Sequence, residues 1–261
     1  GLGSGPIFGG RNADFGDTDI TRTAVGDPIQ SFYGYRVERI FQTQAEIDQL
    51  NAASPNGAYQ VAQTAPGDIK FKDLNGDGQV TPDDREVIGS FIPDFSYGLN
   101  FDANYKNFFM SMYWYGNQGN DVYNALQVTR QGGVRLFGHD VAVLDAWTPE
   151  NTNTSIPRML SGDPNANNRT SDRYLEDASF LRLQNLKIGY QFPEEWLGRT
   201  LNNNVSKLTI YVSGNNLATF TKYSGYDPEI GARGNNLRVQ GVDYGQYPRP
   251  QSFLLGLELG F

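Results

Sequence analysis

The feature that most constrains this chain is an alternation of apolar and polar residues with a period of two, which recurs in five separate segments. From Phe95 to Tyr105, aromatic and aliphatic residues hold the odd positions, and Ser, Gly, Asn and Asp hold the even ones. The alternation returns in residues 108–115, 185–192, 208–213 and 252–261. Because successive side chains of a β-strand point to opposite faces, the pattern predicts five strands, each with one apolar and one polar face.

The connections between these segments alternate between short and long. A turn at Lys106-Asn107 and about a dozen residues from Pro193 to Asn204 are short, whereas residues 120–179 and 218–251 form loops of about sixty and about thirty residues. Short turns on one side and long loops on the other are typical of outer-membrane β-barrels. With the last strand ending on the periplasmic side, every long loop lies outside the cell.

The charged residues of the predicted strands agree with a lipid-facing sheet. Asp102, Lys187 and Glu258 all fall on the polar face. The apolar face thereby avoids a cost of roughly 2–4 kcal/mol for each Lys or Arg at the bilayer midplane.

Five strands are too few to close a barrel, since even the smallest barrels have about eight, and an open sheet edge in lipid leaves backbone polar groups unsatisfied. We therefore expect residues 94–261 to be transmembrane strands of a larger all-β barrel, and residues 1–93 to be an extracellular loop region. That region is expected to hold a strand within Ser31–Phe41, a short helix capped by Thr43 and Glu46, and an acidic loop. Because a β-sandwich also alternates, a soluble sandwich stays open as an alternative.

Composition excludes several classes of function. The chain has 21 Lys and Arg against 29 Asp and Glu, a net charge of −8, which opposes binding to a nucleic-acid backbone. With no cysteine and only His139, it lacks the residues for disulfides, Cys-ligated zinc or a multi-histidine metal site. There is no P-loop, dinucleotide fingerprint, HExxH motif or nucleophile elbow. We expect no enzymatic activity.

One loop has the spacing of an EF-hand calcium loop, DLNGDGQVTPDD at residues 73–84. Side-chain oxygens would come from the first, third, fifth and twelfth positions and a backbone carbonyl from the seventh: Asp73, Asn75, Asp77, Asp84 and Gln79 respectively. Asp at the twelfth position is shorter than the usual Glu, so we expect weak Ca²⁺ binding. Thr81-Pro82-Asp83 predicts a helix start after the loop. The alternative is an Asx-turn loop whose carboxylates accept backbone amides without metal.

Aromatic residues in the long loops are candidates for contact with a sugar ring or a partner protein. The candidates are Trp147, Tyr223, Tyr226 and Tyr244. For aromatics beside the strands, packing in an interfacial girdle is the alternative interpretation.

Short motifs recur in order along nearly the whole chain. They are Val25–Pro28, Phe32–Tyr35, Pro66–Gly78 (PGDIKFKDLNGDG), Gly119–Asn124 (GNDVYN), Trp147–Asn151 (WTPEN), Tyr174–Leu183 (YLEDASFLRL), Val212–Leu217 (VSGNNL), Tyr223–Glu229 (YSGYDPE) and Val242–Pro248 (VDYGQYP). Each motif is weak alone, but the ordered set resembles the C-terminal third of SusC/RagA-type TonB-dependent outer-membrane transporters of the Bacteroidetes.

This resemblance implies a 22-stranded barrel with an N-terminal plug and a TonB box, importing oligosaccharides or peptides across the outer membrane. It also implies a SusD-like surface lipoprotein as partner, which would lid the barrel at the extracellular loops. The TonB complex would supply energy through the N-terminal part of the family's proteins, which precedes the region that this chain resembles. Phe261, which ends the last strand, resembles the signal read by the barrel-assembly machinery. The alternative function is a soluble, calcium-dependent, carbohydrate-binding β-sandwich, which the acidic loop and the aromatics would suit.

Overall fold

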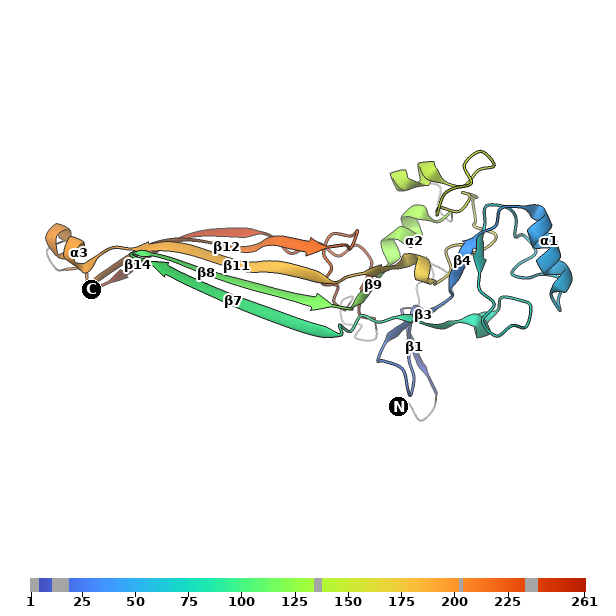
Figure 1. Ribbon diagram of the computed structural model, residues 1–261, viewed down its shortest axis with the longest axis horizontal. Helices are drawn as coiled ribbons and strands as arrows, with labels where there is room; N and C mark the ends of the chain where they lie inside the picture. Colours follow the sequence, from blue (N-terminus) through green and yellow to red (C-terminus); the bar gives the residue numbers. More distant parts are fainter. Residues whose placement is uncertain (1–4, 11–18, 134–137, 202–203, 233–238) are drawn as a thin grey trace. The chain divides into compact units, whose positions relative to one another are not determined.

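The computed structural model describes residues 5–10, 19–133, 138–201, 204–232 and 239–261, and it divides into two compact units (Figure 1). We call Pro93–Asn120, Asp177–Pro228 and Tyr247–Phe261 the strand unit. We call Gly1–Ile92, Asp121–Glu176 and Glu229–Gln246 the loop unit. Within the described residues, no helix is long and apolar enough to cross a membrane.

The strand unit is one antiparallel sheet with the order β14-β12-β11-β8-β7 (Figure 1). Its strands are β7 (Phe95–Tyr105), β8 (Phe108–Gln118), β11 (Phe180–Gln191), β12 (Lys207–Thr221) and β14 (Ser252–Gly260). Every segment with a two-residue period is therefore a strand, and consecutive segments are neighbours. Helix α3 (Glu194–Leu201) lies in the connection between β11 and β12.

Three of these strands, β8, β11 and β12, extend beyond their sequence patterns, and β11 and β12 contain irregularities. The register of β11 shifts between Leu183 and Asn185 against both of its neighbours, and Asn216 in β12 has a positive φ of 53°. An inserted residue changes which positions share a face, so Leu181 and Leu183 join the face of Leu186 and Ile188. In β11 and β12 the sequence pattern stops at the irregularity although the hydrogen-bonded ladder continues, which is why these two predicted segments are too short.

Glycines within the strands make room for aromatic rings from neighbouring strands. A Cβ atom built on Gly256 would lie 2.2 Å from the ring of Tyr211, and one built on Gly189 would lie 2.3 Å from the ring of Phe109. Both rings therefore pack directly over the backbone of the next strand, a pairing that compensates for the missing glycine side chain.

The part of the loop unit that the structure describes contains three small sheets. The first has four strands: β1 (Ile7–Gly9), β2 (Thr21–Thr23), β3 (Ser31–Gly34) and β6 (Glu86–Gly89). In the second, β4 (Val37–Ile40) pairs with β5 (Ile69–Phe71). In the third, β9 (Asp121–Asn124) lies between β10 (Leu175–Asp177) and β13 (Val242–Asp243). The helices among the described residues of this unit are α1 (Gln44–Ala53), α2 (Ala125–Gln131) and the 3-10 helices η3 (Pro82–Asp84), η4 (Val141–Asp145) and η5 (Asp172–Tyr174). The prediction of an all-β chain with short helices in its loops is confirmed at this level.

Three local predictions in the loop unit need correction. The predicted strand within Ser31–Phe41 is two strands, β3 and β4, which belong to different sheets. Helix α1 begins after Thr43, whose Oγ1 accepts from the Glu46 amide at 3.3 Å, but the Glu46 carboxylate binds Arg39 and does not reach back to Thr43. The helix predicted after the acidic loop is only the single turn η3, because the following residues pair with β3 as β6.

Hydrophobic core is concentrated in the loop unit. One buried cluster surrounds Phe32, Tyr123 and Tyr174, and another surrounds Phe41 and Phe71. A buried polar network also lies there: both oxygens of Asp68 accept from Arg158, each at 2.9 Å, and Asn167 donates to Asp68 at 3.0 Å. In β7, by contrast, nearly every residue is exposed, on both faces of the sheet.

Candidate functional site

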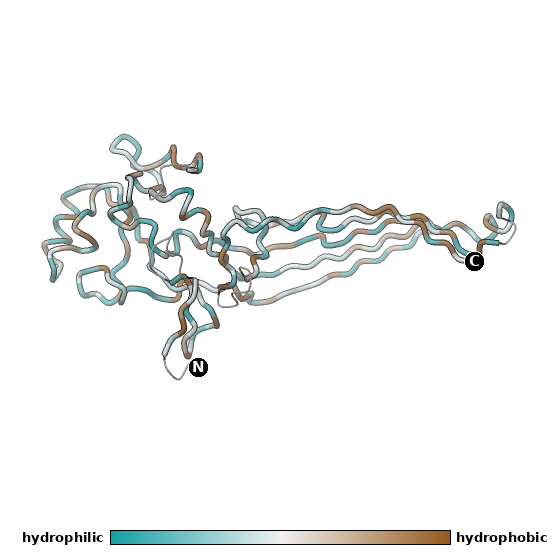
Figure 2. Tube along the Cα trace, turned by 180° about the vertical axis from the view of Figure 1, so that it is seen from behind, coloured by the Kyte–Doolittle hydropathy of each residue, from teal (hydrophilic) through white to brown (hydrophobic). Residues whose placement is uncertain are grey.

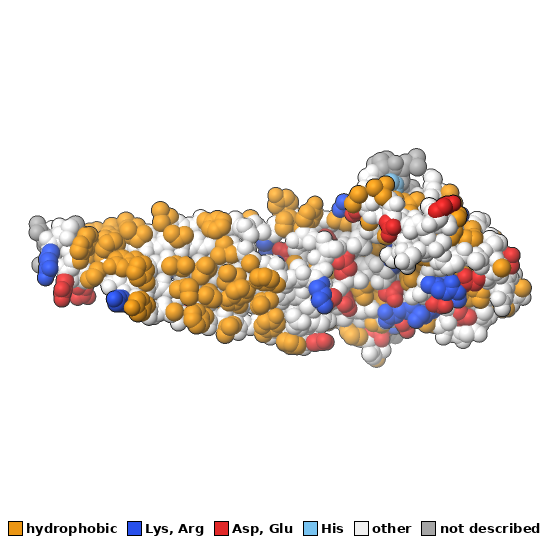
Figure 3. Space-filling model, turned by 45° about the horizontal axis from the view of Figure 1, so that its top comes forward, with side chains coloured by type: hydrophobic (Ala, Val, Ile, Leu, Met, Phe, Trp, Pro, Cys, Tyr) orange, Lys and Arg blue, Asp and Glu red, His pale blue; other side chains and the backbone are white. Residues whose placement is uncertain are grey.

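The five-stranded sheet has one continuous apolar face. Register pairing places Leu99 beside Trp114, Leu186 beside Met112, and Ile210 beside Leu257 on this face. Along the described strands it carries no Asp, Glu, Lys or Arg, and hydrophobic side chains gather over the strands in Figure 3. Leu255 is 76% exposed. Exposed apolar surface on this scale is the kind that contacts lipid or another protein.

The opposite face carries all the charges of these strands. Asp102, Ser111, Lys187 and Ser213 lie side by side across four strands. The Lys187 ammonium lies 3.8 Å from the centre of the Tyr211 ring, and the Asn185 amide donates to Asn215 at 2.8 Å. The prediction that Asp102, Lys187 and Glu258 share the polar face is confirmed by this register. Figure 2 shows the resulting mixture of hydrophobic and hydrophilic residues along each strand.

A buried ion pair marks one end of the polar face. Arg182 donates to the Asp227 carboxylate at 2.6 Å and to the Thr219 hydroxyl at 2.9 Å. The Arg249 amide donates to the second oxygen of Asp227 at 3.4 Å, and its guanidinium donates to the Tyr115 hydroxyl at 3.2 Å. These contacts tie the segments around Asp227 and Arg249 to the sheet. Sequence reasoning missed them, although Arg182 interrupts an otherwise apolar stretch and so offered a signal.

Of the four aromatic contact candidates, Tyr226 alone exposes most of its side chain, 70%. Trp147 is buried and donates from its indole nitrogen to Gln42 at 3.0 Å. Tyr223 is also buried, and Tyr244 packs against a core cluster of the loop unit. The structure places Tyr223 and Tyr226 in the strand unit and Trp147 and Tyr244 in the loop unit. A contact role for these residues stays a prediction, with Tyr226 the most accessible of them.

The acidic loop is closed by hydrogen bonds from backbone amides to its side chains. Asp73 accepts from Gly76 and Gly78 at 2.7 and 2.8 Å. The Asp84 carboxylate is fully buried and accepts from the amides of Leu74, Asn75 and Thr81 at 2.8, 3.3 and 2.7 Å.

The side chains of two further predicted ligands, Asn75 and Asp77, also accept hydrogen bonds from backbone amides of the acidic loop. Asn75 accepts from the Asp77 amide at 2.9 Å, and Asp77 accepts from the Gln79 amide at 3.0 Å. Within the described residues, no group of three or more His, Cys, Asp or Glu is placed to hold a metal ion. The donors are all oxygens, the type that calcium binds, so Ca²⁺ binding stays a prediction.

Phe261 follows β14 and is 91% exposed. Its ring is therefore accessible in the structure. A role as an assembly signal stays a prediction.

Comparison with known proteins identifies the family. No family model matches the chain. A TonB-dependent receptor of Formosa agariphila, named P3, is 37% identical over 241 residues, which cover 90% of this chain and 22% of that receptor. The TonB-dependent receptor SusC of Bacteroides thetaiotaomicron is 28% identical over 96% of this chain and 24% of its own length. This chain belongs to the SusC/RagA-type TonB-dependent receptors.

A solved structure supports the same fold for this receptor chain. The structure entitled "Structure of the RagAB peptide transporter" superposes with a TM-score of 0.69 at 24% identity, over 93% of this chain and 24% of that one. The receptor chain thus spans about a quarter of the length of the relatives it matches. The named relatives are receptors and transporters, which agrees with a sequence lacking a catalytic motif.

Proposed function

We propose that this chain forms part of the wall and the extracellular loops of a TonB-dependent nutrient importer in the outer membrane. The observation that carries the proposal is the separation of the two faces of the strand unit: one face is apolar and uncharged, and the other is polar. Lipid would cover the first face, and the second would line the path of an oligosaccharide or peptide. The chain would contribute binding surface and no catalytic group.

The complete receptor would close the barrel through strands beyond this chain, to the 22 strands that the family resemblance implies. In the described sheet, β7 and β14 are each paired on one side only, so each has an edge available for further strands. The partners would be a SusD-like lipoprotein at the extracellular surface and the TonB complex through the plug. The long loops would then lie outside the cell.

The alternative of a soluble, calcium-dependent, carbohydrate-binding sandwich has less support. A sandwich needs a second sheet over the apolar face, whereas the described part of the strand unit contains a single sheet. The relatives are named as TonB-dependent receptors.

Uptake by cells that carry the complete receptor tests the proposal. Replacing both Asn100 and Asn104 with Leu adds apolar bulk to the polar face, and we expect slower uptake at an unchanged amount of receptor in the outer membrane. Ala103→Leu adds bulk to the opposite face of the same strand and serves as the matched control. Unchanged uptake in the double variant, or a receptor that fractionates as a soluble protein, would contradict the proposal.

A further inference from the structure

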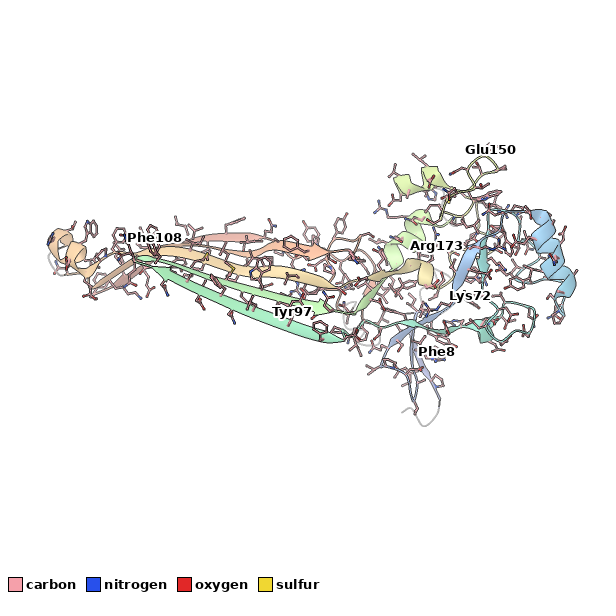
Figure 4. The ribbon with its side chains drawn as sticks, in the orientation of Figure 1. Phe8, Lys72, Tyr97, Phe108, Glu150 and Arg173 are labelled. Atoms are coloured by element: carbon pink, nitrogen blue, oxygen red, sulfur yellow. The ribbon has the colours of Figure 1, made fainter. Side chains whose placement is uncertain are left out.

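A cavity of about 640 Å³ lies within the loop unit, along strand β4. One wall consists of the consecutive residues Val37–Ile40 and Gln42. The other walls come from Ile69 of β5, from Gln127 and Gln131 of α2, from residues 154–156, and from Arg173. Figure 4 labels Arg173, which lies near α2 and β4. The volume is in the range of ligand pockets, roughly 300–1,000 Å³.

The wall formed by β4 is the edge of a two-stranded sheet. In the described residues, β4 pairs with β5 and with no other strand. Phe41, just past β4, donates to Asp68 and accepts from Gly67, both at 2.8 Å, on the β5 side. Because neighbouring residues of a strand direct their backbone groups to opposite sides, those of Ile40 face away from β5. Side chains cover part of this edge: Gln42 donates to the Ile40 carbonyl at 3.0 Å, and Asp172 accepts from the Val37 amide at 2.9 Å.

The cavity also contains a guanidinium without a carboxylate partner among the described residues. Arg173 donates to the Ser155 carbonyl and to the Gln131 amide oxygen, and it lies 5.6 Å from the centre of the Tyr174 ring; all three partners are neutral. Its Nε atom is buried and makes no hydrogen bond. Arg39, also in the lining, differs because it is paired with Glu46 and Glu38. A guanidinium group can donate two parallel hydrogen bonds to the two oxygens of a carboxylate, so Arg173 is suited to bind one.

We propose that this cavity binds an extended peptide, which adds as a strand to the edge of β4 and places its carboxylate on Arg173. Strand addition supplies main-chain hydrogen bonds at the edge, and the carboxylate fixes the direction of the peptide. The four residues of β4 extend about 13 Å at about 3.3 Å per residue, the length of about four peptide residues. The Gln42 side chain would leave the Ile40 carbonyl, so that this oxygen could accept from the peptide. The inference rests on the proposed function, since the peptide would be cargo of the importer.

Direct binding to the complete, detergent-purified receptor tests this site independently of transport. A tryptic digest of casein is the probe, and the retained peptides are identified by mass spectrometry. The most abundant one is then synthesised as the free acid and as the C-terminal amide. We expect amidation to weaken binding by roughly tenfold or more, the range of a charge-assisted hydrogen bond. Arg173→Gln should weaken binding of the acid equally and leave binding of the amide unchanged.

The control variant is Arg130→Gln, which alters an exposed arginine of α2 outside the cavity lining and should leave both affinities unchanged. N-methylation of successive peptide nitrogens tests strand addition without altering the receptor, and losses at every second position are expected. The site is overturned if no peptide is retained, if amidation and Arg173→Gln act additively, or if N-methylation shows no period of two. Retention of tetragalacturonate in place of peptide would assign the cavity to acidic sugars instead. Failed uptake with intact binding would count against the importer and not against this site.

Discussion

Arg182 on β11 donates to the carboxylate of Asp227 at 2.6 Å, and the two side chains are 2% and 10% exposed. The pair joins the polar face of the sheet to a segment that follows β12. Removing one partner of a buried ion pair leaves the other charge uncompensated, which costs about 3–5 kcal/mol.

We therefore expect Asp227→Ala to destabilise the receptor by about that amount, measured by urea unfolding in lipid vesicles. The double variant Arg182→Met, Asp227→Leu removes both charges and should recover most of the loss. Equal stability of Asp227→Ala and the unaltered receptor would show that the pair contributes nothing.

Arginine substitutions on the two faces of strand β14 test which face of the sheet contacts lipid. Leu257 lies on the apolar face beside Ile210, and Leu254 lies on the polar face beside Ser213; both are well exposed. Leu257→Arg would place a charge in lipid at a cost of roughly 2–4 kcal/mol, whereas Leu254→Arg would place it in water. We expect less heat-resistant folded receptor in the outer membrane for Leu257→Arg alone. The reverse order would show that the faces are assigned the wrong way round.

The bonding of Asp84 separates its structural role from calcium binding. Asp84→Ala leaves three backbone amides without their acceptor, and we expect a loss of about 1–3 kcal/mol in calcium-free buffer. Bound Ca²⁺ should raise the unfolding temperature of the unaltered receptor, and Asp77→Ala, in an exposed position, should abolish that rise. If millimolar calcium produces neither heat in calorimetry nor a rise in unfolding temperature, the loop is an Asx-turn structure without metal.

The raised pKa of the buried Tyr59 hydroxyl leads us to expect that the folded protein loses stability in alkali. Its hydroxyl donates to the Phe71 carbonyl at 2.9 Å, and burial raises the pKa of Tyr59 from 10.0 to about 12. The unfolded chain therefore releases this proton at a lower pH than the folded chain does, so stability falls as the pH rises from about 10 to about 12. In Tyr59→Phe this contribution is absent, and its unfolding temperature should fall less steeply over that interval. Parallel curves for the two proteins would contradict the assignment.

The strands of the sheet were predictable because the alternation that reveals each strand lies within a short stretch of sequence. Alternation from Phe95 to Tyr105 reports two faces of one strand, and the turn at Lys106-Asn107 requires only neighbouring residues. The cap of α1 by Thr43 is equally local. The irregularities near Gln184 and Asn216 were not predictable, since they appear only as a break in the pattern until pairing with neighbouring strands is known.

The sequence alone determined that the chain has strands with one apolar and one polar face, since side-chain direction follows from the period of the backbone. It also determined the family, through ordered motifs. Only the tertiary structure decided that Ser31–Phe41 divides between two sheets, that Arg182 is neutralised by Asp227, and that Arg173 lines a cavity beside the edge of β4. These features depend on residues far apart in the chain, whose proximity is set by packing and strand pairing and leaves no periodic trace in the sequence.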